Sequence, residues 1–456
     1  MASAAAIGIS VYVAYKNKLL CELDPTTENQ FKGTLSNYQE AIEKSRDILQ
    51  RVKDEKGIPG LVVGVSIDGN TVWEEGFGFA DVENRVLCSP NTVMRIASIS
   101  KSITMAAVAK LWEQGKLDLN KPVQDYVPTF PQKHFNGKPV TITCRQLVSH
   151  LGGIRHYEKN GITKKNEKNN KKENEKDEFE LKEYLSTVKH PDVMSALDMF
   201  KDDPLIENPG DKFLYTTHGW TLVSAVVEAA SKEPFTTHIT KLFKSLGMKY
   251  TYLDENDVLI YNRSRNYMRS KKGTLINSPY VDNSYKWAGG GFLSTVGDLL
   301  QFGNAMLYSF QYRPNTLKPM DKNTAAKDGK QKVADSNNAF DKNYSKNQLP
   351  GFLNNKTIEA MWQPIAPTYG MGWFVKAQKQ ECQFCESNEF CVYHTGAAIG
   401  ASSVLLILPK NISKDEYLKP ELLPKGIAVT IICNMQSVGL AQTALRIAKE
   451  FDGADL

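Results

Sequence analysis

The chain has 456 residues, of which 41% are hydrophobic and 23% are charged, and its formal net charge is +5. This length and composition are typical of a globular protein with a large core and exclude a chain that is disordered throughout. Much of the lysine lies in one tract, so the charge does not indicate a nucleic-acid partner, and seven scattered cysteines exclude a disulfide scaffold.

The N-terminal segment 2–15 is small and apolar, and Lys16 and Lys18 follow it. It is shorter than the roughly twenty residues that span a bilayer comfortably. We therefore expect residues 1–37 to form a targeting or marginal anchor segment and linker, with a route to membrane association, before one domain over 38–456. The sequence leaves open whether this segment is removed.

A helix and a hairpin are the first elements expected in the domain. The pattern over 38–52 is that of an amphipathic helix, and the strand-like runs 61–67 and 71–79 flank a turn with Asp68 and Gly69. Asp and Gly between two such runs are a strong local signal for a β-hairpin.

Ser98 and Lys101 stand three residues apart at the start of the next predicted helix, 98–115. Residues at this spacing are neighbours on one helical face. A buried lysine, whose charged form is disfavoured by desolvation, can accept the serine proton and create a nucleophile. The spacing alone is weak evidence, because Ser186 and Lys189 repeat it in a segment that we interpret as solvated surface.

Two polar tracts interrupt the chain, at about 158–180 and about 313–348. Neither can bury enough apolar area to order itself, so we expect surface insertions. Recognisable segments resume after each tract, which argues against a domain boundary at either place.

The second half of the chain alternates helical and strand-like patterns. A glycine-rich turn over 287–295 leads into a helix over 296–307, and a final helix covers 439–451. Strand-like segments cover 369–375, 391–394, 401–408 and 427–434. Because strands lie near both ends with helices between, we predict an α+β fold whose sheet unites distant segments.

Two further motifs follow the serine–lysine pair in order, Tyr215-Thr216-Thr217 and His394-Thr395-Gly396. Residues 149–153, which lie between the serine–lysine pair and the tyrosine motif, form a glycine-containing turn. Their order and spacing resemble the serine β-lactamase and D,D-peptidase superfamily, on its class C and esterase side, over roughly 45–451. The resemblance implies an antiparallel sheet built from N- and C-terminal segments, with helices packed on it and a largely helical lobe between.

The resemblance also implies roles for individual residues. Ser98 becomes the nucleophile of an acyl-enzyme, and Lys101 and Tyr215 share the proton transfers. The backbone amides of Ser98 and Ala397 are expected to bind the oxyanion.

The strand that begins with His394 and Thr395 is expected to line the cleft. Gly396 would let an acyl substrate lie against that strand, since it lacks a side chain. Thr217 stands where the family usually has asparagine, and His394 stands where it commonly has lysine. A histidine is largely neutral near neutral pH, so a fixed cation for the carboxylate of a penicillin is missing. We therefore expect acyl transfer on peptides or esters, and neither antibiotic hydrolysis nor penicillin sensing.

Longer stretches, 280–298 and 432–439 among them, resemble the mitochondrial β-lactamase-like proteases of animals. This resemblance implies a peptidase of the mitochondrial intermembrane space that acts on a peptide or protein, assembles into homo-oligomers or filaments, and affects lipid metabolism indirectly. It implies no cofactor. The alternative is a filament-forming scaffold whose retained active site matters little.

Cys382, Cys385, Cys391 and His394 lie close together in the sequence, with spacing that a metal could use. We favour a polar loop with one or two thiols before a strand, and hence no metal site. A disulfide within this group remains an alternative in an oxidising compartment.

Overall fold

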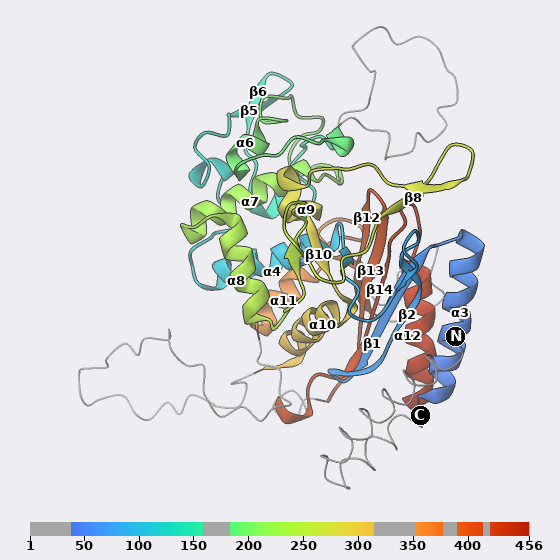
Figure 1. The fold of residues 1–456 in the computed structure, drawn as a ribbon. Coiled ribbons are helices and arrows are strands. Elements are labelled where there is room, and N and C mark those ends of the chain that lie inside the picture. The colour runs from blue at the N-terminus through green and yellow to red at the C-terminus, as the bar shows by residue number, and fades with distance from the viewer. Residues whose placement is uncertain (1–37, 158–182, 314–351, 377–389, 414–419, 456) are drawn as a thin grey trace, which may run out of the picture.

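The computed structural model describes residues 38–157, 183–313, 352–376, 390–413 and 420–455 (Figure 1). The N-terminal segment, the polar tract 158–180, the second tract beyond Arg313, and Cys382 and Cys385 lie outside the described residues. Among the described residues, no helix combines the length and apolar character needed to cross a membrane.

The centre of the fold is a seven-stranded antiparallel sheet in the order β11-β12-β13-β14-β1-β2-β3. Its strands are β1 (Gly60–Ile67), β2 (Asn70–Asp81), β3 (Val86–Leu87), β11 (Phe374–Lys376), β12 (Cys391–Ala398), β13 (Ala401–Pro409) and β14 (Gly426–Cys433). The hairpin predicted from Asp68 and Gly69 is confirmed, and its first strand pairs with β14 from Leu61 opposite Cys433 to Ile67 opposite Ile427. The sheet therefore joins the two ends of the domain, as predicted.

Helices cover both faces of this sheet (Figure 1). Helices α3 (Gln39–Lys56) and α12 (Ala441–Asp452) pack side by side on one face, and α10 (Val296–Gln311) packs on the other. The side chains of strand β1 alternate between these two faces, because successive residues of a strand point to opposite sides of the sheet. Leu61 and Val63 join the core under α3 and α12, whereas Val62 joins the core of the helical lobe.

The helical lobe lies beyond α10 and is built around α4 (Ile99–Glu113). Its other helices are α5 (Cys144–Val148), α6 (Val193–Leu197), α7 (His218–Ser231), α8 (Phe235–Ser245), α9 (Trp287–Gly290) and α11 (Asn355–Met361). Short strands form three small sheets: β4 (Met94–Arg95), β10 (Phe292–Ser294) and β7 (Tyr252–Leu253); β5 (Lys133–Phe135) and β6 (Lys138–Val140); β8 (Tyr267–Arg269) and β9 (Leu275–Asn277). The 3-10 turns η3 (Glu183–Leu185) and η4 (Ser284–Lys286) flank the site described below.

Helix α4 is buried on nearly all sides, which is typical of a central helix rather than an amphipathic surface helix. Its buried hydroxyl groups donate to backbone carbonyls, and so tie the helix to its surroundings. Ser102 donates to Gly372 at 2.7 Å and Thr104 donates to Ala288 at 3.1 Å. The segment expected as a glycine-rich turn over 287–295 is instead the short helix α9 followed by strand β10.

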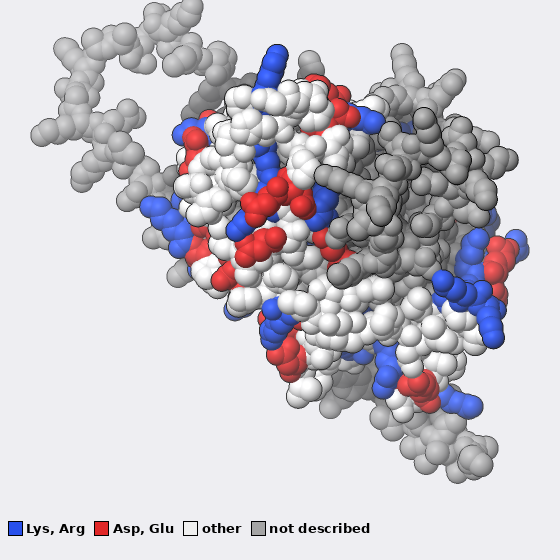
Figure 2. All heavy atoms as spheres, turned by 90° about the horizontal axis from the view of Figure 1, so that it is seen from above, with Lys and Arg blue, Asp and Glu red and all other residues white. Residues whose placement is uncertain are grey.

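On the face seen in Figure 2, Lys and Arg side chains alternate with Asp and Glu side chains over the described residues. No extended area of one sign is visible there. This agrees with the small net charge of the chain.

Candidate active site

Ser98 sits at a sharp turn that joins β4 to α4. The preceding residue, Ala97, has φ +47°, a backbone conformation that side chains other than glycine rarely adopt. Ser98 is the residue that precedes the helix, yet its side chain makes no capping hydrogen bond. The hydroxyl group is therefore left for another partner at the positive end of the helix.

Lys101 is that partner. Its Nζ lies 3.0 Å from Ser98 Oγ, and its side chain is completely buried. The ammonium also donates to the carbonyl of Gly289 and lies 3.4 Å from Thr217 Oγ1. The spacing of three residues thus brings the hydroxyl and the amine together, as a helix requires.

Ser186 and Lys189 have the same spacing, but their lysine is not used in this way. Lys189 is exposed and pairs with Asp257 at 2.8 Å. The interpretation of this copy as solvated surface is confirmed.

Gly289 explains why the glycine-rich segment is needed beside Lys101. A Cβ built at Gly289 would lie 2.6 Å from Cγ2 of Thr217. The missing side chain lets α9 pack closely against the start of α7, where its carbonyl meets the lysine.

Tyr215 approaches Lys101 from the segment that leads into α7. The Lys101 ammonium lies 4.9 Å from the centre of its ring, and the ring packs on His150 at 4.3 Å between centroids. His150 is itself buried, and its Nδ1 accepts from the amide of Thr216 at 3.1 Å. The turn at 149–153 therefore holds the tyrosine motif in place through the contacts of His150.

Strand β12 forms the opposite wall. A Cβ built at Gly396 would lie 2.1 Å from Ser403 Oγ and 2.3 Å from the carbonyl oxygen of Ile96. Protein atoms alone therefore require glycine here, in addition to the substrate argument made from the sequence. This close approach holds β12 against the segment that leads into Ser98.

A cavity of about 250 Å³ lies between these elements. Of the residues singled out from the sequence, it is lined by Ser98, Tyr215, Thr217, Thr395 and Ala397. The structure thus brings residues from α4, the start of α7 and β12 to one place.

The His394 side chain does not line this cavity. It is buried behind β12, where Nε2 lies 3.1 Å from the hydroxyl of Tyr369 and Nδ1 lies 2.7 Å from the carbonyl oxygen of Thr395. Burial, with the positive charge of Lys101, lowers the pKa of His394 to about 3. Its imidazole is accordingly neutral at physiological pH.

Sequence reasoning missed several residues that line the cavity, among them the polar side chains of His156, Tyr157, Tyr184 and Lys286. His156 accepts from the amide of Thr217 at 3.2 Å. Lys286 precedes the glycine-rich segment, and a lysine next to an apolar run was the available signal. Tyr184 borders a polar tract and carried no local signal.

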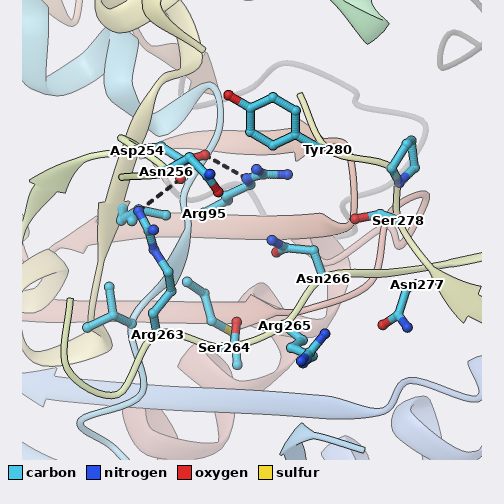
Figure 3. Close-up of a pocket in the computed structure, with 14 residues that line it drawn as sticks. Arg95, Asp254, Asn256, Arg263, Ser264, Arg265, Asn266, Asn277, Ser278 and Tyr280 are labelled. Carbon is cyan, nitrogen blue, oxygen red and sulfur yellow. Dashed lines mark hydrogen bonds and ion pairs between the residues drawn. The ribbon is translucent and has the colours of Figure 1, made fainter. Parts of the chain in front are cut away.

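A larger cavity, of about 340 Å³, lies around β4 and the chain near β8 (Figure 3). Asp254 stands in its wall between two arginines, accepting from Arg95 Nε at 2.7 Å and from Arg263 at 3.3 Å. The described residues that line it include neither lysine nor histidine, so no amine or imidazole base stands beside its serines.

Cys391 and His394 lie on the same strand, and both are buried. Among the residues that the structure describes, no cluster of His, Cys, Asp and Glu could hold a metal ion. Cys382 and Cys385 lie outside that set, so the metal and disulfide alternatives are not tested at those positions.

Comparison with known proteins agrees with this fold. The β-lactamase family model matches residues 45–450. The human mitochondrial serine beta-lactamase-like protein LACTB is 47% identical over 91% of this chain and 80% of its own length, and the mouse protein is 46% identical over 91% and 81%.

Solved structures show the same architecture. The octameric penicillin-binding protein homologue from Pyrococcus abyssi aligns with a TM-score of 0.62 at 22% identity, over 91% of this chain and 76% of that one. The hydrolase EstCE1 aligns with a TM-score of 0.62 at 19% identity, over 90% and 98%. The resemblance identified from the motifs is confirmed: this chain belongs to the β-lactamase family of serine hydrolases.

Proposed function

We propose that the chain hydrolyses peptide or ester bonds through an acyl-enzyme formed on Ser98. The observation that carries this proposal is the 3.0 Å contact between Lys101 Nζ and Ser98 Oγ beside an open cavity. A serine needs an adjacent base to act as a nucleophile, and a buried amine can serve as that base.

In the proposed reaction, Lys101 first releases a proton to solvent, because burial disfavours its charged form. The neutral amine then takes the proton of Ser98 while Oγ bonds to the carbonyl carbon. The displaced electron pair moves to the carbonyl oxygen, which the amides of Ser98 and Ala397 stabilise. Collapse of this intermediate breaks the bond to the leaving group, which receives the proton through Tyr215. Water then attacks the acyl-enzyme by the same proton route and restores Ser98.

A fluorophosphonate probe, which reacts with activated serines, tests this proposal. We expect it to label the wild-type chain and the Ser186→Ala variant and to leave Ser98→Ala unlabelled. Ser186→Ala is the matched control, since it removes a hydroxyl at the same spacing from a lysine. Equal labelling of wild type and Ser98→Ala would refute the assignment of Ser98 as the nucleophile. A peptide library with Ser98→Ala as control would then identify the bond that is cleaved.

The proposal also covers the subcellular location of the protein and its oligomeric state. The mammalian relatives are mitochondrial proteins, which supports a mitochondrial location for this chain. A location in the intermembrane space and an indirect effect on lipid metabolism are the finer parts of this proposal. One structural relative, the penicillin-binding protein homologue from Pyrococcus abyssi, is octameric, which supports a homo-oligomer. A filament is the larger assembly that we propose for this chain.

Electron microscopy of wild type and Ser98→Ala separates the enzyme from the scaffold alternative. Assembly that persists without Ser98, together with no turnover by wild type, favours the scaffold. Turnover that depends on Ser98 favours the hydrolase.

A further inference from the structure

Lys286 is a buried lysine whose ammonium lies among tyrosine rings. It ends the turn η4, and the residue is 3% exposed. Its Nζ lies 4.4 Å from the ring centre of Tyr184, 5.2 Å from that of Tyr285 and 5.8 Å from that of Tyr157. Aromatic faces attract a cation but accept no full hydrogen bond from it.

The ammonium has no hydrogen-bond acceptor among the described residues. The neighbouring carboxylate, Asp254, is already engaged, since it accepts from Arg95 at 2.7 Å and from Asn283 at 2.6 Å. A buried charge without an acceptor is costly, so proteins seldom keep one without a use. Burial and the positive charge of Arg95 lower the pKa of Lys286 to about 7, and Asp254 opposes this effect. A nearby anion would favour the charged form of the lysine.

Lys286 also lines the cavity that contains Ser98. A ligand in this cavity can therefore reach both the hydroxyl group and the ammonium. The ammonium of Lys286 has three N–H donors, and a carboxylate has oxygen atoms that accept from them. The opposite charges of the two groups strengthen these hydrogen bonds.

The three rings around the ammonium, those of Tyr157, Tyr184 and Tyr285, form a tyrosine cage, and a hydrogen bond ties this cage to strand β12. Tyr184 donates its hydroxyl to the carbonyl of Ala397 at 2.7 Å. The adjacent Glu183 accepts from Arg155 at 2.8 Å and lies 3.0 Å from His218 Nε2. The position of the ammonium is therefore fixed relative to β12, as a residue that selects substrates requires.

Resting on the proposed hydrolase function, we propose that Lys286 determines substrate specificity by binding a carboxylate of the substrate in the cavity of Ser98. It supplies, from another element, the cation that His394 does not provide. The carboxylate can come from an acidic side chain of a peptide or from its free C-terminus.

Paired substrates test this proposal and distinguish the two sources. One pair is acetyl-Ala-Ala-Asp-p-nitroanilide and its Asn counterpart, and the other is acetyl-Ala-Ala-Ala as free acid and as amide. We expect wild type to favour the acid at least tenfold in one pair, by kcat/KM or by protection of Ser98 from the fluorophosphonate probe. Lys286→Met should reduce this preference to below twofold, and Lys286→Arg should retain most of it.

Lys189→Met is the matched control, because it removes the same charge from an exposed position. It should leave the preference unchanged. Absence of a preference in both pairs, or a preference that survives in Lys286→Met, would overturn the assignment. If the probe labels Ser98→Ala as it labels wild type, the hydrolase proposal fails instead, so the two failures are distinguishable.

Discussion

Tyr369 and His394 are joined by a hydrogen bond of 3.1 Å between the phenolic oxygen and Nε2, in the interior behind β12. Because the carbonyl oxygen of Thr395 only accepts, Nδ1 of the imidazole carries the proton that bridges these groups at 2.7 Å. Nε2 then accepts from Tyr369. The network therefore assigns a neutral histidine whose two nitrogens are both satisfied.

This neutral histidine makes the fold sensitive to acid. Its folded-state pKa is about 3, whereas an unperturbed histidine titrates near 6.5. Below pH 6.5 His394 therefore binds a proton in the unfolded chain but not in the folded chain. The free energy of unfolding then falls by up to about 1.4 kcal/mol for each unit by which the pH is lowered. The buried His150, whose pKa is also lowered well below its usual value, acts in the same direction.

We expect His394→Gln to lose about 2 kcal/mol less than wild type between pH 6.5 and pH 5, measured by urea unfolding. His134→Gln, at an exposed position on β5, is the control and should keep the wild-type slope. Identical pH slopes for wild type and His394→Gln would contradict the assignment.

Lys101→Met should slow labelling of Ser98 by the fluorophosphonate probe about 10²- to 10⁴-fold, because the base is removed. The substitution replaces a buried amine by an apolar side chain of similar length, so the fold should persist, as circular dichroism would check. Labelling of Lys101→Met at the wild-type rate would rule out the lysine as base.

Tyr215→Phe should slow turnover more than labelling, because the proposed role of its hydroxyl is to carry the proton to the leaving group.

Gly396→Ala should destabilise the fold by about 3 kcal/mol, because the new Cβ meets the backbone carbonyl of Ile96 and overpacked positions relax poorly. Gly439→Ala is the control, since no atom lies within 4 Å of a Cβ built there. Thermal unfolding of both variants measures the difference. An unchanged melting temperature in Gly396→Ala would mean that β12 can move away from the turn before Ser98.

Lys286→Met should stabilise the protein at low pH. The folded pKa is about 7, and the unfolded value is near 10.5. Below pH 7 the lysine is charged in both states, so the folded state carries the full cost of the buried charge. Between pH 7 and 10.5 the unfolded chain binds more protons, and wild-type stability rises.

We therefore expect Lys286→Met to exceed wild type in unfolding free energy by about 4 to 5 kcal/mol at pH 6.5 and by about 1 kcal/mol near pH 10, measured by urea unfolding. Lys189→Met, at an exposed ion pair, should change stability little at either pH. A Lys286→Met variant that is less stable than wild type at pH 6.5 would show that the ammonium has a stabilising partner in the folded chain.

Several features of this protein depend on short-range geometry, and these could be predicted from the sequence. Asp68 and Gly69 specify a tight turn between two strands, and the structure has the hairpin there. The contact of Ser98 with Lys101 follows from the pitch of a helix. The motif order identified the family, and with it the antiparallel sheet that joins both ends of the domain.

Burial and contacts between distant segments decided the rest. Ser186 and Lys189 have the same spacing as Ser98 and Lys101, but they lie at the surface, where no desolvation acts on the amine. The strand position of His394 was predictable, but its burial against Tyr369 was not, because the direction of a strand side chain depends on what the sheet packs against.

The tyrosine cage of Lys286 is the clearest case. Its rings come from Tyr157, Tyr184 and Tyr285, which lie on separate segments and meet only in the folded chain. The sequence by itself determined the pair that can carry the chemistry, since helix pitch is local. Only the tertiary structure decided which charges face the cavity and which are buried as neutral groups, because that depends on desolvation by residues far apart in the chain.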